Sequence, residues 1–543
     1  MINGVAVAAR KGSPDYTGAY ATVREGGSED VLTVAWRSFA LASLDTVDQL
    51  LGIYMDVVYP MFPLFHGPEL WSRIKKREHL TNRSFFASIM GACALASARA
   101  RDGAVDGGHG FDRNGREAQA EIYFSAAQDA IFKDLHKAQG VGYMKACGLL
   151  ALTAIQFGQI SMLHQYLGHF CTLSAMQQFH DENHWPEGLT PVEKEERRRL
   201  YWSMYTLDVY QAVVFNGILK FQETHANVRY PSEVDDETLS GGVLTPTSEL
   251  NWFQGWNFAT DLYRVLEHSI KRVRRNEHHG EGRFSIVRLL VTDGIPEEQV
   301  MENLLGLYNE LPDRFKEYSV PSTGDKAKDL FGFQAANIQA TIQLVRMTLF
   351  SINANRDVRQ KCDVAEQVLS AFHSICPAFL RAISTPLVYH LGAIGRVLAS
   401  AAEGVLTEDT YQRIRGLLIS MADLLQGLEF TLQPMVGASK GLRMQVDKID
   451  QYMHAQRRQM NEMYRSQQPL HSSNPMGMTD LGTSSMGPPA NTQMNGFAPR
   501  ATQEEFQLPP DLLGDWPWQW DLQQDPNSMN FGMNGFSGFN TFG

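Results

Sequence analysis

The sequence predicts an all-α protein, with one large multi-helix domain followed by a disordered C-terminal tail. From Ser43 to about Met460, apolar residues recur with a helical period, and alternating β-branched runs bounded by turns are scarce. After about Arg465 the composition changes sharply to Pro, Gly, Asn, Gln, Ser and Met. These observations divide the 543 residues into a mobile lead-in over 1–36, an all-helical domain over 37–465 and a tail over 466–543.

Bulk properties limit the classes of protein that the chain can belong to. The net charge of −12 argues against a surface that is basic throughout and made for nucleic acid. The longest nearly uncharged run, Phe85–Ala98, is short for a membrane span and is typical of a buried helix. The N-terminus lacks a secretory signal, and the five cysteines form no Cys-x-x-Cys pair. We therefore expect an intracellular protein with reduced thiols and no membrane contact.

Several helix boundaries can be read from local chemistry. Thr190-Pro191-Val192-Glu193 is a capping box with proline at the first helical position, and a nearly apolar helix follows over 197–219. Ile295-Pro296-Glu297-Glu298 predicts another helix start by the same logic. Loops are predicted over 102–115, 276–282 and 321–326, and a division into two lobes is expected near 283–325.

The tail combines acidic and bulky apolar residues. Residues 467–543 carry seven carboxylates against a single basic residue, Arg500, and cannot bury enough apolar surface to order on their own. Bulky apolar side chains alternate with carboxylates and prolines over 504–522, which is typical of disordered activation segments that enter a groove on a coactivator. The alternative is a tail without function, or one that folds back over the helical domain. The candidate activation residues are Phe506, Leu508, Leu512, Leu513, Trp516, Trp518, Trp520 and Leu522.

Three stretches of the helical domain together resemble a known family. The first is the apolar helix at Leu50–Met55 and the turn that follows it, Tyr59-Pro60-Met61-Phe62-Pro63-Leu64-Phe65-His66. The second begins at Tyr123, continues in the apolar helix around Leu149–Phe157 and ends at His180. The third is Glu-Arg-Arg-Arg-Leu-Tyr-Trp-Ser-Met-Tyr-Thr-Leu-Asp over 196–208, continuing to Tyr230-Pro231 and Asp235-Asp236. They resemble the fungal-specific regulatory domain, or middle homology region, of transcription regulators with a binuclear zinc cluster.

The third stretch carries the most specific part of the resemblance. Its signature residues are Arg197, Arg198, Arg199, Trp202, Tyr205 and Asp208. Asn216-Gly217-Ile218-Leu219 replaces the family's usual Gly-Arg-Pro, so the resemblance does not predict the details of that loop. A buried charge is costly unless it is paired, so we expect at least one arginine to pair with a carboxylate, and Asp208 is the natural candidate. A structural ion network is favoured over a ligand site.

The resemblance implies a nuclear regulator of RNA polymerase II genes that binds zinc and DNA. The family's zinc cluster needs six cysteines in Cys-x-x-Cys pairs, and no cysteine lies before Leu50. We therefore expect no cofactor in this chain, and DNA contact only through a missing N-terminal module or a partner. Further expected partners are coactivators, a homo- or heterodimer, and a small-molecule effector in an apolar interhelical pocket. The candidate nuclear import residues are Lys271, Arg272, Arg274 and Arg275.

Other interpretations compete with this one. The chain could be an interaction protein that lacks the cluster and modulates another regulator by hetero-association. It could also be a helical enzyme, because Gly437-Ala438-Ser439-Lys440-Gly441 has the Gly-x-Ser-x-Gly form of a hydrolase elbow. That motif needs a preceding strand and an ordered acid and histidine, so catalysis is not expected. The Glu277–Glu281 run, with two histidines, is better explained as a solvated loop than as a metal site.

Overall fold

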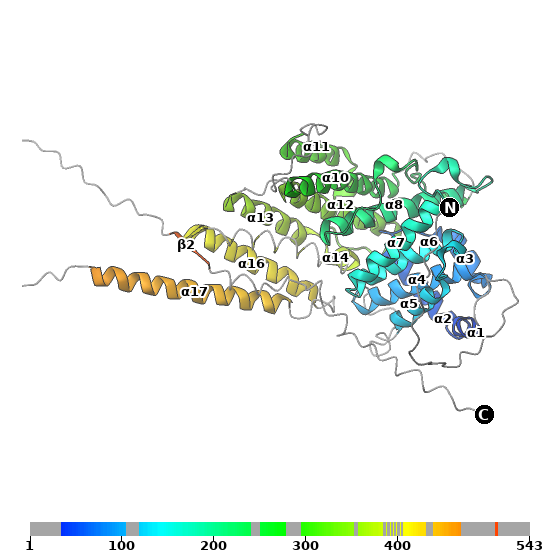
Figure 1. Cartoon of the computed structure of the whole chain (residues 1–543), viewed down its shortest axis with the longest axis horizontal. Helices are drawn as coiled ribbons and strands as arrows, with labels where there is room; N and C mark the ends of the chain where they lie inside the picture. Colours follow the sequence, from blue (N-terminus) through cyan, green and yellow to red (C-terminus); the bar gives the residue numbers. More distant parts are fainter. Residues whose placement is uncertain are drawn as a thin grey trace, which may run out of the picture.

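The computed structural model describes most of the chain, and helices make up nearly all of that part (Figure 1). The described residues are 34–104, 119–240, 250–278, 295–351, 357–383, 405–429, 438–467 and 505–508, with isolated positions between 387 and 402. The predicted all-α fold is confirmed for these residues. Within these ranges, no helix combines the length and the apolarity that a membrane span requires.

The first half of the chain packs around α4 (Arg83–Arg101) and α6 (Val141–Gln156). The side chains from Phe85 to Ala100 are all buried, which confirms that the long uncharged run is a core helix. The neighbouring helices are α1 (Val34–Ala42), α2 (Leu44–Ile53), α3 (Gly67–Lys75), α5 (Gln119–Ala130) and α7 (Ile160–Met176). A π-helical turn extends α2 over Tyr54–Val58, and short 3-10 turns lie at Glu78–Leu80, Leu135–Lys137, Glu182–His184, Glu223–His225 and Asp313–Lys316.

Longer helices dominate the second half. They are α8 (Pro191–Val214), α10 (Phe253–His278), α11 (Glu297–Glu310), α12 (Lys326–Ser351), α13 (Val358–Ser374), α16 (Glu408–Glu429) and α17 (Ala438–Gln467), with the shorter α9 (Asp236–Ser240) and α14 (Pro377–Ile383). The capping box that starts α8 is confirmed. The Thr190 hydroxyl accepts from the Glu193 amide at 3.2 Å, and the Glu193 carboxylate accepts from the Thr190 amide at 2.8 Å. The start of α11 directly after Pro296 is also as predicted.

Two hydrophobic cores occur among the described residues, and α12 belongs to both. Ile338, Ile342 and Val345 of α12 lie in the core built by α1 to α11, whereas Ala336 and Met347 lie in the core built by α13 to α17. Residues 336 and 347 therefore lie on a different face of α12 from residues 338, 342 and 345, because helical positions repeat every 3.6 residues. The expected division near 283–325 falls ahead of this shared helix.

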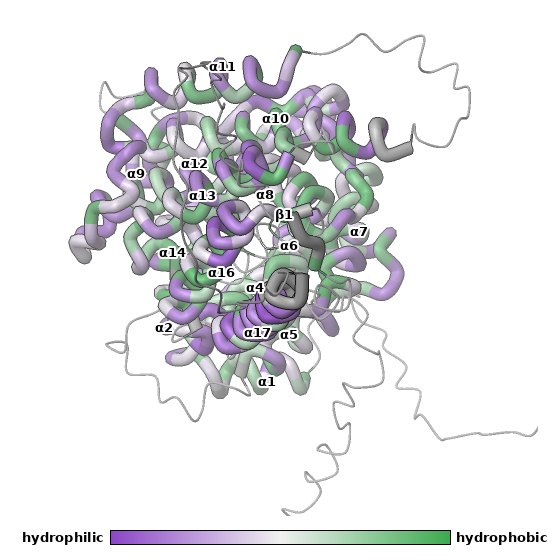
Figure 2. The backbone as a smooth tube through the Cα atoms, turned by 90° about the vertical axis from the view of Figure 1, so that its left-hand side faces the viewer, coloured by the Kyte–Doolittle hydropathy of each residue, from purple (hydrophilic) through white to green (hydrophobic). Residues whose placement is uncertain are grey.

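Helices α16 and α17 form an antiparallel pair that extends from the rest of the molecule (Figure 1). Arg415 of α16 donates to Asp450 of α17 at 2.9 Å, and Arg443 of α17 pairs with Asp423 of α16. Most residues of α17 are hydrophilic (Figure 2), but its Leu442, Val446, Ile449 and Met453 are buried in the second core. One face of α17 therefore packs in the second core, and its opposite face is exposed to solvent.

A two-stranded antiparallel ladder involves part of the tail. Strand β1 (Val405–Thr407) pairs with β2 (Glu505–Gln507), and these two short strands agree with the predicted scarcity of strands among the described residues. The tail was predicted to be disordered, yet its residues 505–508 are ordered against the second core. The sequence pattern missed this pairing because three-residue strands have no measurable period. The remaining tail residues, 468–504 and 509–543, lie outside the described part of the chain.

Candidate functional site

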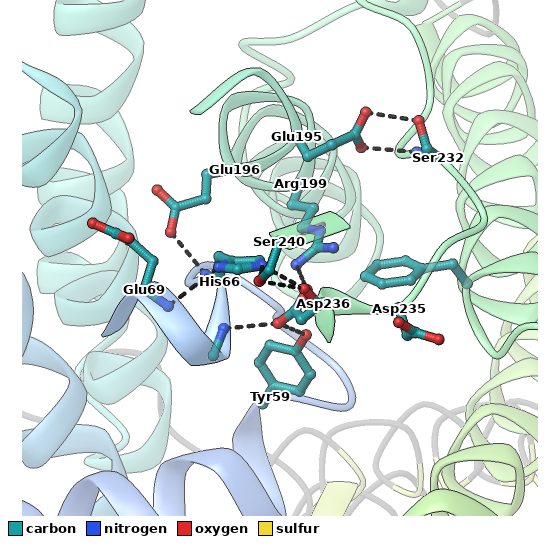
Figure 3. Close-up of polar contacts among 12 residues, drawn as sticks. Tyr59, His66, Glu69, Glu195, Glu196, Arg199, Ser232, Asp235, Asp236 and Ser240 are labelled. Atoms are coloured by element: carbon teal, nitrogen blue, oxygen red, sulfur yellow. Dashed lines mark hydrogen bonds and ion pairs between the residues drawn. The ribbon is translucent and has the colours of Figure 1, made fainter. Parts of the chain in front are cut away.

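A buried polar network joins the three segments with the most distinctive sequence (Figure 3). These segments are the turn that runs from Tyr59 to the start of α3, the first half of α8, and the start of α9. They lie far apart in the sequence, and each contributes at least one charged or polar side chain to the network.

Asp236, at the start of α9, is the central carboxylate and is 7% exposed. Its Oδ2 accepts from the Tyr59 hydroxyl and from the Gly67 amide, both at 2.7 Å, and its Oδ1 accepts from Arg199 Nη1 at 2.7 Å. Burial alone would raise the pKa of Asp236, but the Arg199 guanidinium, the Gly67 amide and the Tyr59 hydroxyl hold this pKa below its usual range. The carboxylate is therefore charged, and both of its oxygens accept hydrogen bonds from within the fold.

Arg199 lies in the interior, with no exposed surface. Its guanidinium lies 4.4 Å from the centroid of the Phe253 ring, and its Nε and Nη2 atoms have no hydrogen-bond partner within the described residues. Burial would lower the pKa of Arg199, but Asp236 and Tyr59 raise it overall. Asp236 is thus the carboxylate that makes burial of this cation tolerable.

His66 connects α3, α8 and α9 through three different atoms. Its Nδ1 accepts from the Glu69 amide at 3.2 Å and so caps α3. Its Nε2 lies 2.8 Å from the Asp236 carbonyl oxygen, which assigns the ring proton to Nε2. Its backbone amide donates to Glu196 of α8 at 2.7 Å. The histidine therefore fixes the position of the turn relative to both other segments.

Glu196 also holds the ammonium of Lys145, a nearly buried residue of α6, at 2.8 Å. Burial lowers the pKa of Lys145, and Glu196 opposes that shift. A cavity of about 250 Å³ lies beside this pair, and its lining includes Arg73, Gly142 and Arg197.

The three consecutive arginines of α8 have three different environments, because successive helical positions point about 100° apart. Arg198 pairs with Glu182 at 2.7 Å and with Glu195 at 2.6 Å. Arg197 lies over the rings of Phe179 and Trp185, at 5.5 and 5.7 Å. The expected pairing of an arginine with a carboxylate is confirmed for Arg198 and Arg199.

The prediction that Asp208 is the carboxylate that pairs with one of these arginines was wrong. Asp208 accepts from the backbone amides of Lys220 and Phe221 at 2.6 and 2.8 Å and from the Gln211 amide group at 3.0 Å. It lies about two and a half turns of helix beyond Arg199, too far along α8 for contact with that arginine. Burial raises the pKa of Asp208, and the two backbone amides and Lys220 limit that rise. Its role is to hold the backbone at Lys220 and Phe221, directly after the 216–219 segment that departs from the family pattern.

The remaining signature side chains bind other parts of the domain. The Trp202 indole donates to the Arg229 carbonyl at 3.0 Å, and the Tyr205 hydroxyl donates to Glu267 of α10 at 2.6 Å. Sequence reasoning did not identify Asp236, Glu196 and Lys145 as members of the network. The signal that could have found Lys145 is its position as the lone cation within the apolar stretch of α6.

The other candidate sites lie elsewhere. In the candidate import run, Arg272 pairs with Glu297 at 2.7 Å, and Arg274 donates to the Gly217 carbonyl at 2.7 Å. Lys271 pairs with Glu267, so three of the four import candidates contact the domain itself. Of the candidate activation residues, Phe506 lies in β2 and Leu508 is 3% exposed, whereas Leu512, Leu513, Trp516, Trp518, Trp520 and Leu522 lie outside the described residues.

Chemistry that would indicate catalysis or a metal is not assembled within the described residues. Ser439 of the Gly-x-Ser-x-Gly match lies in the first turn of α17 and is 5% exposed. The five cysteines lie in separate elements, and no three metal-binding side chains are grouped in the described ranges. The residues present therefore do not fit the zinc cluster that the resemblance implies. In the Glu277–Glu281 run, Glu277 and His278 end α10, and the other three residues fall outside the described chain.

Comparison with known proteins supplies an independent finding. Residues 51–313 match the sequence model of the family described as "Fungal specific transcription factor domain". A Saccharomyces cerevisiae protein that carries the name "Putative transcriptional regulatory protein" is 36% identical over 53 residues. That stretch covers 10% of this chain and 7% of the yeast protein. No solved structure matches the chain. The whole buried network, from Tyr59 to Ser240, lies inside the residues matched by the family.

Proposed function

We propose that this chain, whose residues 51–313 are a fungal specific transcription factor domain, regulates RNA polymerase II genes in the nucleus through its helical domain and its tail. The strongest support is that the residues that match the family contain the whole of the buried network. That network joins the Tyr59–Gly67 turn, α8 and α9 through Asp236, Arg199, Glu196 and His66. In this proposal the helical domain regulates activity, and the tail recruits coactivators.

The tail is the proposed activating element because its composition suits a shallow groove with a basic rim. Trp516, Trp518 and Trp520 alternate with other residues between Asp515 and Asp521. The carboxylates repel one another and keep the indoles available, and an indole buries a large apolar area on binding. DNA would be contacted through an N-terminal zinc module or through a partner protein.

A cavity of about 60 Å³ is proposed as a site for only a very small effector, since typical ligand pockets have volumes of roughly 300 Å³ or more. It lies between α4, α6, α8, α10 and α12, and it is lined by polar as well as apolar side chains. The polar lining residues are Arg99, Thr206, Tyr210, Tyr263, Asn337 and Thr341. Because α12 belongs to both hydrophobic cores, a small molecule bound here would contact the element that links them.

The activation proposal is tested by fusing the full chain to a heterologous DNA-binding domain and measuring a reporter gene. Replacing Trp516, Trp518 and Trp520 with alanine should remove most of the activation, because each indole would supply buried area to the coactivator. The matched control replaces three tail aromatics that have no neighbouring carboxylate, Phe531, Phe536 and Phe539, and should retain activation. Equal activity of the two triple variants would overturn the proposal.

The alternative, a regulator that acts by hetero-association, makes a different prediction for DNA. Specific binding of a promoter fragment by the purified chain alone would count against hetero-association. Mapping the 5′ end of the native transcript supplies the complementary result. An upstream frame that encodes a six-cysteine cluster supports direct DNA binding, and a closed frame favours partner dependence.

A further inference from the structure

The ladder between β1 and β2 joins the tail to the second hydrophobic core. The strands pair in the register Val405 with Gln507, Leu406 with Phe506, and Thr407 with Glu505. β2 comes from the tail, which is otherwise predicted to be disordered, whereas β1 directly precedes α16. The pairing therefore attaches an acidic-aromatic segment to a folded edge by main-chain hydrogen bonds, as a peptide attaches in β-augmentation.

One side chain of the tail enters the core beside this ladder. Leu508, the residue after β2, is 3% exposed and belongs to the same cluster as Leu406, which is fully buried. The cluster also contains Ile414, Leu418 and Met453 of α16 and α17. Burial of the Leu508 side chain contributes a favourable free energy to this attachment. The tail is therefore held by an apolar anchor as well as by the backbone hydrogen bonds of the ladder.

The edge that receives the tail is held rigidly by residues outside the tail. Thr410 Oγ1 accepts from the Thr407 amide at 2.8 Å and donates to the Thr407 carbonyl at 2.8 Å, which fixes β1 onto the first turn of α16. Arg457 of α17 pairs with Glu408, and Arg415 holds Asp450 at 2.9 Å. Arg457 and Arg458 lie toward this end of α17, opposite Glu408 and Asp409 in the first turn of α16.

We infer that β1 and the adjoining core form an acceptor site for an extended acidic-apolar peptide, occupied in this chain by its own residues 505–508. The inference rests on the proposed function only in regarding the tail as the activating element. Trp516 follows Leu508 by eight residues, so when the site is occupied the chain can carry it at most about 29 Å from Leu508, at 3.6 Å per residue. A coactivator that needs residues 505–508 would have to displace them from β1.

The first test measures amide hydrogen exchange in the purified full-length chain. Leu508→Asp should accelerate exchange at 405–406 by about tenfold or more, because the apolar anchor of the ladder is lost, whereas the Thr407 amide is held by Thr410 in either case. The matched control Leu522→Asp makes the same change elsewhere in the tail and should leave 405–407 unchanged. An unchanged thermal midpoint in both variants shows that the helical body is intact. Equal exchange in wild type and Leu508→Asp would overturn the inference.

The second test supplies the tail segment as a separate peptide. A fluorescein-labelled peptide of residues 501–512 should bind Leu508→Asp at least tenfold more tightly than wild type, in which the linked tail already fills the site. A peptide of the same composition in scrambled order should bind neither. Equal binding of the peptide to wild type and to Leu508→Asp would contradict the inference that the chain's own tail fills the site. A concentration-dependent dimer of wild type that Leu508→Asp abolishes would contradict it as well, because the tail would then come from a second copy. Neither readout depends on whether the tail activates transcription, so the two proposals can fail separately.

Discussion

Asp236 shows at the scale of single residues how the fold depends on one charge. It accepts three hydrogen bonds, two from the Tyr59–Gly67 turn and one from α8, and it is the carboxylate that pairs with the fully buried Arg199. Removing one partner of a buried ion pair leaves the other charge uncompensated in a medium of low polarity. The consequence is that a change of one atom, from carboxylate to amide, should affect the turn at Tyr59–Gly67, α8 and α9 together.

Asp236→Asn should therefore reduce the free energy of unfolding by about 3–5 kcal/mol. The matched control is Asp235→Asn, which changes the same residue type one position earlier. Asp235 accepts from the Thr238 amide at 2.6 Å, a capping role that asparagine performs equally well, so the control should change stability by less than about 0.5 kcal/mol. Chemical denaturation followed by circular dichroism measures both values. Similar losses in the two variants would contradict the central role of Asp236.

The pKa of Asp236 also predicts how this contribution depends on pH. Arg199, Gly67 and Tyr59 overcome the effect of burial and lower the pKa in the folded state. A carboxyl group with a lowered pKa contributes stability that is complete above its unfolded pKa, about 4, and is lost as the pH falls through the folded value. The stability difference between wild type and Asp236→Asn should be constant near neutral pH and shrink below about pH 4. Denaturation curves at several pH values test this, and a difference that persists unchanged in acid would refute it.

Sequence reasoning reached part of this site. It identified the signature residues and the need for an arginine to pair with a carboxylate, because both follow from residue type and helical burial. It chose Asp208 because that carboxylate is isolated in an apolar helix, but Asp208 is satisfied locally by the amides of Lys220 and Phe221. The partnership of Arg199 with Asp236 spans 37 residues and depends on chain folding that no local pattern encodes.

At the scale of whole elements, α6 shows how closely two helices approach. Gly142, in the first turn of α6, faces the start of α4, and a Cβ atom there would lie 2.7 Å from the Ser84 carbonyl oxygen. The backbone at Ser84 cannot rotate out of the way as a side chain can. Any residue larger than glycine at position 142 must therefore push α4 and α6 apart. The position requires glycine because of this contact and not because of its own backbone angles.

Gly142→Ala should consequently destabilise the protein by about 1–3 kcal/mol. Gly168, in the middle of α7, is the matched control because a Cβ atom there would meet nothing within 4 Å. Gly168→Ala should stabilise the fold by about 0.5–1 kcal/mol, since alanine loses less backbone entropy in a helix. Thermal unfolding of the two variants gives the signs. A stabilising Gly142→Ala would show that α4 and α6 have room to separate.

Elements were predictable where their ends carry chemistry. Thr190-Pro191 and Glu193 mark the start of α8 because capping is a local interaction. Pro296 marks the start of α11 without a side-chain cap, because its ring fixes the backbone angle φ at the helix entrance. The ladder of β1 and β2 was missed because its partners are nearly a hundred residues apart and three residues long. Short strands are specified by the edge that they pair with and by the burial of a neighbour such as Leu508, and neither is visible in the strand's own sequence.

At the scale of the whole molecule, α12 determines whether the two hydrophobic cores behave as one unit. Ile338, Ile342 and Val345 belong to the first core, and Ala336 and Met347 to the second. Unfolding either core exposes one face of α12 and weakens the helix that the other core needs. The sequence indicated two lobes from the loop pattern alone, but the sharing of one helix could not be read from it, because the two faces of α12 are both apolar.

Because the two cores share α12, we expect a substitution that destabilises the second core to destabilise the first core as well. Leu418→Ala truncates a buried side chain of α16 and should reduce the free energy of unfolding by about 2–5 kcal/mol. Trp202, Trp252 and Trp256 all lie in the first core, so their fluorescence reports its unfolding separately. The measurement uses a chain in which Trp516, Trp518 and Trp520 are phenylalanine, which removes the tail signal. If the cores are coupled through α12, Leu418→Ala shifts the fluorescence midpoint and the exchange of α16 amides together. If the fluorescence midpoint stays in place while α16 exchanges faster, the cores unfold independently, and an effector bound near α12 would have no route from one to the other.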